Sequence, residues 1–228
     1  MPLLALDTSA AVSVAVTDDD GRPLARRHDD LPRHHAELLA PMVAGALADA
    51  GVDRRDLTAI VVGTGPAPFT GLRVGLVTAR TLALALGVDA LGVPSLDAIA
   101  AAALPRVPDG VPLVVATDAR RREVYWSAYS RAAGADVDVL VAPRVGPAPE
   151  IAADPALARA CVVGAGAALY PAAFEGLTHL PDAGTLDAAE LVPLALARRA
   201  AGADLPTAPL YLRRPDAVPS AGSKRVLG

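Results

Sequence analysis

Two aspartates, each at the end of an apolar run, are the residues of this chain with the most direct chemical use. Asp7 follows residues 3–6 and precedes Thr8 and Ser9, and Asp118 follows a similar run in the second half. A carboxylate in a turn after a strand can hold magnesium beside a phosphate, but it can also accept hydrogen bonds from its own turn. Both uses are open for Asp7 and Asp118.

Glycines that could face a phosphate are scarce beside both aspartates. The turns read Asp7-Thr8-Ser9-Ala10 and Asp118-Ala119-Arg120-Arg121, whereas phosphate loops need glycine so that backbone amides can approach the anion. A Gly-Ala-Gly triplet at 164–166 is a candidate for the adenosine side, and it also fits a tight turn from strand to helix. Any residual nucleotide or phosphate contact would come from Asp7, Thr8, Ser9, Asp118, Gly164 and Gly166.

The histidines and the single cysteine do not form a pattern that predicts a metal site or a nucleophile. His34 and His35 are adjacent and point to different sides of a helix, His28 lies in a strand or turn, and His179 lies in a loop far along the chain. Cys161 has no second cysteine with which to form a disulfide or a Cys-based zinc site. We therefore predict no catalytic residue and no metal ligand.

A Gly/Pro-rich loop at residues 63–75 follows a buried strand at 59–62 and leads into an apolar helix at 71–86. Its spacing differs from a Walker loop and it lacks the lysine that would reach phosphates. Thr70 is the expected N-cap of the helix. A helix with so few charges cannot face water on every side, so we expect its own sheet and another subunit to cover it, or else burial within one monomer.

The elements that surround these residues repeat along the chain. The first half reads as three strands, a helix at 34–50, the strand and helix just described, a short strand at 90–93 and a helix from 95 to 103 capped by Ser95. From residue 111 the same strand, Asp-turn, strand, strand order begins again, with later helices at 149–160 and 186–201. An internal duplication predicts two lobes with a cleft between them. The expected division is an N-terminal lobe at 1–103, a linker at 104–110, a C-terminal lobe at 111–212 and a flexible tail at 213–228.

Composition excludes several classes of function. The 228 residues are 53% apolar and 3% aromatic, and the net charge is −4 with a pI near 5.5, so the chain lacks the basic character of a protein that grips nucleic acid by itself. Asp7 interrupts the first apolar run, which disfavours a signal peptide, and Arg or Asp interrupts the Ala-rich helices. We expect a cytoplasmic protein that does not associate with a membrane.

A duplicated βββαβα unit with an acidic hairpin opening each half resembles the actin, Hsp70 and sugar-kinase superfamily, an α/β fold. More narrowly, the chain resembles the TsaB (YeaZ) family of tRNA threonylcarbamoyladenosine biosynthesis proteins. The matching motifs run in the family's order along nearly the whole chain: Leu4-Ala5-Leu6-Asp7-Thr8-Ser9, His35 with residues 38–42, residues 63–75, residues 92–96, residues 118–120 with 123–125, and residues 209–213. Ala67-Pro68 departs from the Gly-Ser that the family usually has.

The resemblance implies a non-catalytic relative of the TsaD synthase. TsaD-type enzymes carry a His pair four residues apart after the helix that matches 71–86, and here Ser95 and Ile99 occupy those positions. The resemblance therefore implies no enzyme activity by this chain itself, but an essential supporting role in a threonylcarbamoyltransferase complex. It implies TsaD and the P-loop ATPase TsaE as partners, self-association as a homodimer, at most indirect contact with tRNA, and no cofactor for the chain alone, with ATP or ADP left open for the assembled complex.

The partner surface is expected on the helices at 34–50 and 71–86, which would pack as a bundle with the equivalent helices of a partner of the same fold. The candidate contacts are His35, Leu39, Met42, Val43, Arg73, Leu76, Val77 and Arg80.

Two enzyme alternatives remain. One is an ATP-binding kinase or ATPase of the actin-like superfamily that uses Asp7 and Asp118, which magnesium-dependent nucleotide binding by the isolated chain would reveal. The other is a metallopeptidase, which the missing His pair argues against and which metal analysis of the purified protein would test.

Overall fold

The computed structural model describes residues 1–30, 35–181 and 184–213, which form two five-stranded mixed sheets. The first sheet contains β1 (Leu3–Asp7), β2 (Val12–Thr17), β3 (Pro23–Asp29), β4 (Ala59–Gly63) and β5 (Asp89–Val93). The helices of this half are α1 (His35–Ala50), α2 (Phe69–Leu86) and α3 (Ser95–Ala103), with 3-10 turns at Arg54–Asp56 and Leu104–Arg106.

The second sheet contains β6 (Leu113–Asp118), β7 (Glu123–Arg131), β8 (Val137–Pro147), β9 (Cys161–Val163) and β10 (Thr178–His179). Its helices are α4 (Ala148–Ala152), α5 (Ala165–Leu169) and α6 (Leu191–Ala200). The 3-10 turns of this half lie at Pro155–Leu157, Pro171–Phe174 and Ala188–Glu190.

The two sheets have the same topology. Their orders are β3-β2-β1-β4-β5 and β8-β7-β6-β9-β10 when the second is read from its β8 edge. In each sheet the first three strands form an antiparallel meander. The fourth strand pairs in parallel with the first strand, and the fifth strand pairs in parallel with the fourth. The duplicated βββαβα plan predicted from the sequence is therefore confirmed.

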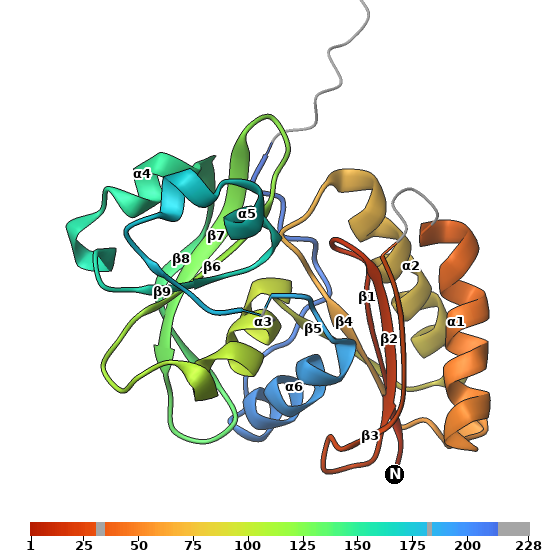
Figure 1. Ribbon diagram of the computed structural model, residues 1–228. Helices are drawn as coiled ribbons and strands as arrows, with labels where there is room; N and C mark the ends of the chain where they lie inside the picture. Colours follow the sequence, from red (N-terminus) through yellow and green to blue (C-terminus); the bar gives the residue numbers. More distant parts are fainter. Residues whose placement is uncertain (31–34, 182–183, 214–228) are drawn as a thin grey trace, which may run out of the picture.

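The helices and sheets stack in layers, which Figure 1 shows from the side. On β1, alternate side chains enter different cores: Leu3 and Ala5 pack toward the second sheet, and Leu4 and Leu6 pack toward α1 and α2. The core between the sheets contains α3, α6 and residues of both sheets, while α4 and α5 cover the outer face of the second sheet. Burial on both faces explains why β1 reads as an uninterrupted apolar run.

The predicted start of α2 and two predicted caps were wrong. Helix α2 begins at Phe69 rather than at residue 71, without a side-chain cap from Thr70. Helix α3 has the predicted bounds, but the Ser95 hydroxyl does not cap it. Pro68 and Pro94 are the N-cap residues instead, and their fixed φ holds the backbone extended just before each helix begins.

The helices predicted at 149–160 and 186–201 were too long. The first ends at Ala152 and gives way to a 3-10 turn, and the second begins at Leu191 after another. Pro155 begins the 3-10 turn that interrupts the first stretch. In the second stretch, Ala189 N donates to the Asp187 carboxylate, which caps the 3-10 turn before α6. The predicted helix start at residue 34 and the tail from 214 onward lie outside the described residues.

The chain after α6 returns to the first sheet. Gly92 N donates to Leu205 O at 2.9 Å, and Leu210 N donates to Thr64 O at 2.9 Å. The carbonyl of Pro206 occupies the space that a side chain at residue 92 would need, so only glycine fits there. Residues 203–213, called here the C-terminal strap, therefore lie against β5 and the loop that leads into α2, as Figure 1 shows in blue.

A buried cluster of charges joins the two halves of the chain between the sheets. The Arg198 guanidinium of α6 lies 2.9 Å from the Asp97 carboxylate of α3 and binds Asp136 through both its Nε and its terminal nitrogen. The Tyr129 hydroxyl of β7 donates to the other Asp97 oxygen at 2.8 Å. Burial raises the pKa of Asp97, although the nearby Arg198 charge lowers it in part. We call this group the Arg198 cluster.

Candidate functional site

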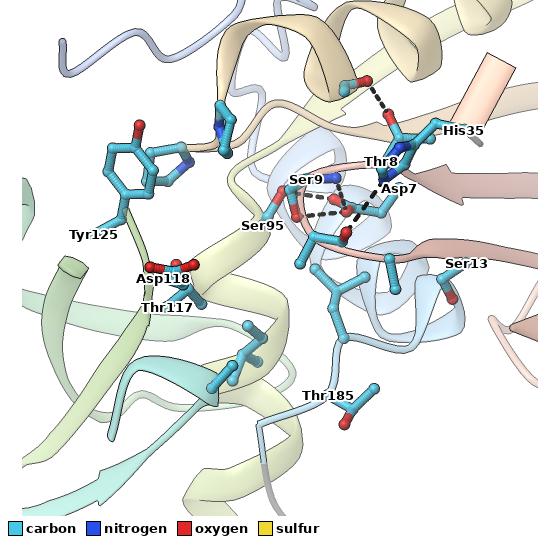
Figure 2. Close-up of a pocket in the computed structure, with 18 of the residues that line it drawn as sticks. Asp7, Thr8, Ser9, Ser13, His35, Ser95, Thr117, Asp118, Tyr125 and Thr185 are labelled. Atoms are coloured by element: carbon cyan, nitrogen blue, oxygen red, sulfur yellow. Dashed lines mark hydrogen bonds between the residues drawn. The ribbon is translucent and has the colours of Figure 1, made fainter. Parts of the chain in front are cut away.

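A cleft of about 570 Å³ lies between the two halves, and both acidic turns predicted from the sequence line it. Asp7 ends β1 on one wall, and Asp118 ends β6 on the other. Figure 2 shows the two aspartates on opposite sides of the cleft. The duplication of the chain thus places equivalent carboxylates on facing walls.

The Asp7 carboxylate is buried and fully engaged by neighbouring donors. One oxygen accepts from Ser9 N at 2.7 Å and from the Ser9 hydroxyl at 2.6 Å, and the other accepts from the Ser95 hydroxyl at 2.6 Å. Burial raises the pKa of Asp7, and the hydrogen bonds from Ser9 and Ser95 lower it in part. A side chain at Gly63 would overlap this carboxylate, so glycine is required there. Asp7 therefore joins β1, β4 and α3.

Asp118 repeats the backbone part of this arrangement at the second turn. One of its oxygens accepts from Arg120 N at 2.8 Å, as Asp7 accepts from the amide two residues further on, and the other lies 3.1 Å from the Arg120 guanidinium. The Asp118 side chain is partly exposed to the cleft. Each carboxylate thus stabilises its own turn, the use that needs no ligand.

Thr8 connects the first turn to α2. Its hydroxyl donates to Gly71 O at 2.8 Å and accepts from Gly75 N at 3.0 Å, one helical turn further on. A methyl group at residue 75 would lie 2.6 Å from this hydroxyl oxygen. The Gly71 and Gly75 positions in the loop motif therefore allow the helix to approach the acidic turn closely.

The other two predicted nucleotide contacts have structural uses. Gly164 has φ 104° and sits where a side chain would overlap the Ala116 carbonyl, and a side chain at Gly166 would lie 2.8 Å from Val124. Both glycines lie at the turn from β9 into α5, the alternative that the sequence left open. His35 lines the cleft, and its Nε2 lies 3.2 Å from Ala10 O.

The predicted partner residues divide into buried and exposed groups. Leu39, Met42, Val43 and Leu76 are buried beneath α1 and α2 in the core of the first half. Val77 is 59% exposed, and Leu84, which the sequence prediction did not include, is 85% exposed on the same helix. The outward face of α2, called here the exposed stripe, therefore carries two large apolar side chains with the exposed Arg80 and Thr81 between them, and the buried group lies beneath it.

Arg73 and Arg80 of α2 bind the C-terminal strap. Arg73 Nε donates to the Tyr211 hydroxyl at 2.9 Å while its guanidinium lies 3.4 Å from the centre of the Phe69 ring. Phe69 and Tyr211 stack with their ring centres 4.9 Å apart. Arg80 Nε donates to the Thr207 hydroxyl at 2.8 Å. These contacts fix the strap beside the exposed stripe of α2.

Sequence reasoning did not anticipate Ser95 as a partner of Asp7 or the strap as a partner of α2. The 88 residues between Ser95 and Asp7 leave no local pattern that could reveal the contact. The motif at 209–213 was the available signal for the strap, since it contains Tyr211 and Arg213.

The side chains that line the cleft offer few groups that are available to bind a metal ion or to react. Within the described residues, no three of the His, Cys, Asp and Glu side chains gather in a way that could hold a metal ion. Asp7, the residue placed to act in the cleft, already accepts three hydrogen bonds. A buried carboxylate in this state stabilises the protein framework more readily than it binds a new cation.

The family described as "TsaD: tRNA N6-adenosine threonylcarbamoyltransferase" matches residues 29–170 of this chain. An uncharacterized protein of Mycobacterium tuberculosis is 41% identical over 230 residues, which cover 96% of this chain and 95% of that protein. The tRNA threonylcarbamoyladenosine biosynthesis protein TsaB of Escherichia coli is 38% identical over 133 residues, which cover 58% of this chain and 56% of TsaB.

The solved structure of YeaZ from Pseudomonas aeruginosa aligns with a TM-score of 0.75 and 34% sequence identity, covering 92% of this chain and 99% of that one. A second structure from the same organism, described as an uncharacterized protein with similarity to peptidase YeaZ, aligns with a TM-score of 0.76 and 35% identity, covering 93% of this chain and 99% of that one. The likeness therefore extends over both halves of the fold.

Proposed function

The chain belongs to the TsaB/YeaZ family of TsaD-related proteins with the actin-like α/β fold, and we propose that it is a non-catalytic subunit of a tRNA threonylcarbamoyladenosine synthase. In this role it binds and supports TsaD. TsaD then transfers threonylcarbamoyl from threonylcarbamoyl-AMP to the adenosine on the 3′ side of the anticodon. The protein works in the cytoplasm, and the P-loop ATPase TsaE joins the assembly.

The exposed stripe of α2 is the observation that carries this proposal. Val77 and Leu84 are large apolar side chains left open to water on the face of α2 that points away from its sheet. By length and composition α2 could cross a membrane, but Leu72, Leu76 and Ala79 are buried against the first sheet. Apolar surface exposed in this way favours burial against another protein. A partner with the same fold would offer an equivalent helix.

The state of Asp7 favours support over catalysis. In a kinase or ATPase of this superfamily the cleft carboxylate would have to be available to a hydrated magnesium ion, whereas Asp7 is buried and holds Ser9 and Ser95. Releasing it would leave the Ser9 and Ser95 hydroxyl groups without this acceptor and would break the hydrogen bond that ties α3 to the end of β1. The kinase alternative is therefore the weaker one.

The test is the mass of the purified chain by light scattering, alone and mixed with TsaD from the same organism. We expect a homodimer that exchanges into a mixed complex, and we expect Val77→Glu/Leu84→Glu to abolish both associations because two charges would be buried in an apolar interface. Leu76 is unsuitable for this test because it is buried within the subunit.

The matched control is Val139→Glu/Leu140→Glu on β8, where the side chains are 47% and 53% exposed. This pair adds the same charge to an apolar surface on the other half of the chain. The proposal fails if the α2 variant stays folded and retains both associations, or if the β8 variant loses them equally.

A further inference from the structure

The C-terminal strap connects the two halves of the chain at one end of the cleft. Its earlier part is hydrogen-bonded to β5 and to the loop that leads into α2, both in the first half. At its end, Arg213 donates to Ala119 O at 2.8 Å and pairs with Glu123, both in the β6–β7 hairpin of the second half. Figure 1 shows the last blue segment of the described chain beside this hairpin. The strap therefore spans the boundary between the halves.

A groove of about 140 Å³ lies between the end of the strap, the loop into α2 and the β6–β7 hairpin. Residues 211–213 line it from the strap, and residues 67–69 and 119–121 line it from the two halves. Pro68, Arg120 and Tyr125 line both this groove and the cleft of about 570 Å³. The groove thus adjoins the cleft, and the end of the strap forms one of its walls.

Ala119 lies where the strap meets the hairpin. It is 1% exposed, although the next three residues of the turn, 120–122, are exposed. Its carbonyl accepts from Arg213, and it lines the groove together with residues 211–213. Movement of residues 211–213 away from the hairpin would therefore open the groove and uncover this residue.

The strap is held by surface contacts rather than by a core. None of residues 203–213 is buried, and the side chains of Arg73 and Arg80 that bind the strap lie on the exposed side of α2. Segments with few buried apolar contacts and exposed hydrogen bonds open locally at a lower free-energy cost than the rest of a protein. The Arg198 cluster, by contrast, joins the halves in a buried position. The strap can therefore leave its place while the two sheets stay packed.

The strap also touches the helix on which the partner surface is proposed. The Tyr211 hydroxyl accepts from Arg73, which lies one helical turn before Val77 on the outward face of α2. Tyr211 is 38% exposed. A partner that covers Val77 would also meet Arg73 and Tyr211, and it would bury them while the strap is in place.

We propose that residues 211–213 form a lid over one end of the cleft, with Arg213 as its latch, and that a partner on α2 holds this lid closed. Burial of Tyr211 by the partner adds contacts only when the lid is closed, so partner binding and lid closure stabilise each other. The role of the partner rests on the proposed function, whereas the lid itself belongs to the isolated chain.

The test measures how fast a thiol reagent labels a cysteine placed beneath the lid. Ala119→Cys supplies this probe, and the native Cys161, which is buried on β9, reports opening of the whole fold in the same molecule. Adding Arg213→Met should accelerate labelling at position 119 at least about fivefold, because the lid loses a hydrogen bond and an ion pair of a charged group. Labelling of Cys161 should not change.

A second variant and a matched control separate the lid from a general loss of stability. Tyr211→Ala removes the contacts of the lid with α2 and should also accelerate labelling at position 119. Arg106→Met removes a similar bond, from a guanidinium to Pro181 O at 2.7 Å, outside the lining of the groove, and should change neither rate. The lid is refuted if Arg213→Met and Tyr211→Ala leave labelling at position 119 unchanged, if Arg106→Met accelerates it equally, or if labelling of Cys161 rises by the same factor.

The role of the partner is tested by repeating the labelling with TsaD from the same organism. TsaD should slow labelling at position 119 at least about fivefold in Ala119→Cys, and less than about twofold when Tyr211→Ala is added. No slowing, or equal slowing in both proteins, would overturn the coupling, because simple shielding by TsaD does not depend on Tyr211. If TsaD does not associate with the chain at all, the proposed function fails, and labelling of the isolated chain still decides whether the lid exists.

Discussion

Replacing Arg198 by methionine is expected to be among the most destabilising changes in the core between the two sheets. Methionine fills much of the same volume but leaves the Asp97 carboxylate, which is almost completely buried, with Tyr129 as its remaining partner. Removing one member of a buried ion pair costs about 3–5 kcal/mol, because the remaining charge has lost both water and its counter-charge. That is a large part of the total stability of about 5–15 kcal/mol that is typical of a folded domain.

The neighbouring residue provides a matched control. Arg199 pairs with Asp89 at 2.7 Å, a shorter distance than the 2.9 Å between Arg198 and Asp97, but the side chains of both Arg199 and Asp89 are more than half exposed. Exposed pairs contribute about 0–1 kcal/mol because water screens them and the side chains lose freedom. Arg199→Met should therefore change the unfolding free energy by less than about 1 kcal/mol. Burial, rather than distance, sets the difference between the two variants.

The assay is urea unfolding followed by the fluorescence of Trp126, which is buried on β7 and is the only tryptophan of the chain. Adding Asp97→Asn to Arg198→Met should restore part of the loss, because no unpaired charge then remains in the core. The pH dependence has a definite sign. Without Arg198 the folded pKa of Asp97, which burial already raises, rises further.

Because that pKa then lies above the unfolded value near 3.8, the folded form gains stability as pH falls and loses it as pH rises through the folded pKa. The loss in Arg198→Met should therefore be largest near neutral pH and smaller in acid. The reasoning is refuted if Arg198→Met and Arg199→Met cost the same, or if the Arg198→Met loss is independent of pH.

Two further predictions concern the Asp7 turn. Gly75→Ala should destabilise the protein by about 1–3 kcal/mol in urea unfolding, because the new methyl group would lie 2.6 Å from the Thr8 hydroxyl oxygen. The control is Gly176→Ala, which should be nearly neutral because the space around Gly176 is open. Equal effects of the two substitutions would contradict the argument that α2 approaches the Asp7 turn closely. Asp7→Asn removes a carboxyl group whose pKa is raised above 3.8 by burial. The unfolding free energy of the wild type relative to this variant should therefore fall as pH rises from below 3.8 through the folded pKa. If the wild type instead became more stable relative to the variant as pH rises, a positive charge would have to stabilise the carboxylate.

The topology was predictable because its signals are local. Apolar runs that end in Asp7 and Asp118, separated by one duplication length, place equivalent turns in equivalent sheets, and hydrogen bonds within each turn need no distant partner. The pairing of Asp7 with Ser95 was not predictable, because α3 is placed by packing rather than by a motif. Ser95 was therefore assigned to a helix cap, which the structure does not contain.

The partner surface shows a different limit. Helix α2 is apolar on nearly every side, so its periodicity cannot tell which apolar residue faces the sheet. Leu76 and Val77 are equally apolar in sequence, but the former is buried and the latter is exposed. The contacts of Arg73 and Arg80 with the strap were equally hidden, because residues 203–213 have no regular hydrophobic pattern and bind largely through backbone groups and side-chain hydroxyls.

The C-terminal strap also affects the order in which the protein can mature during synthesis. The first sheet and α1 to α3 are made early, yet β5 obtains its backbone partner Leu205, and Arg73 its partner Tyr211, from the last part of the described chain. Domains generally begin to fold while translation continues. Here the edge of the first sheet stays open until residues 203–213 have left the ribosome exit tunnel. A nascent first half therefore meets chaperones and partners with this edge uncovered, and the emergence of residues 203–213 closes it.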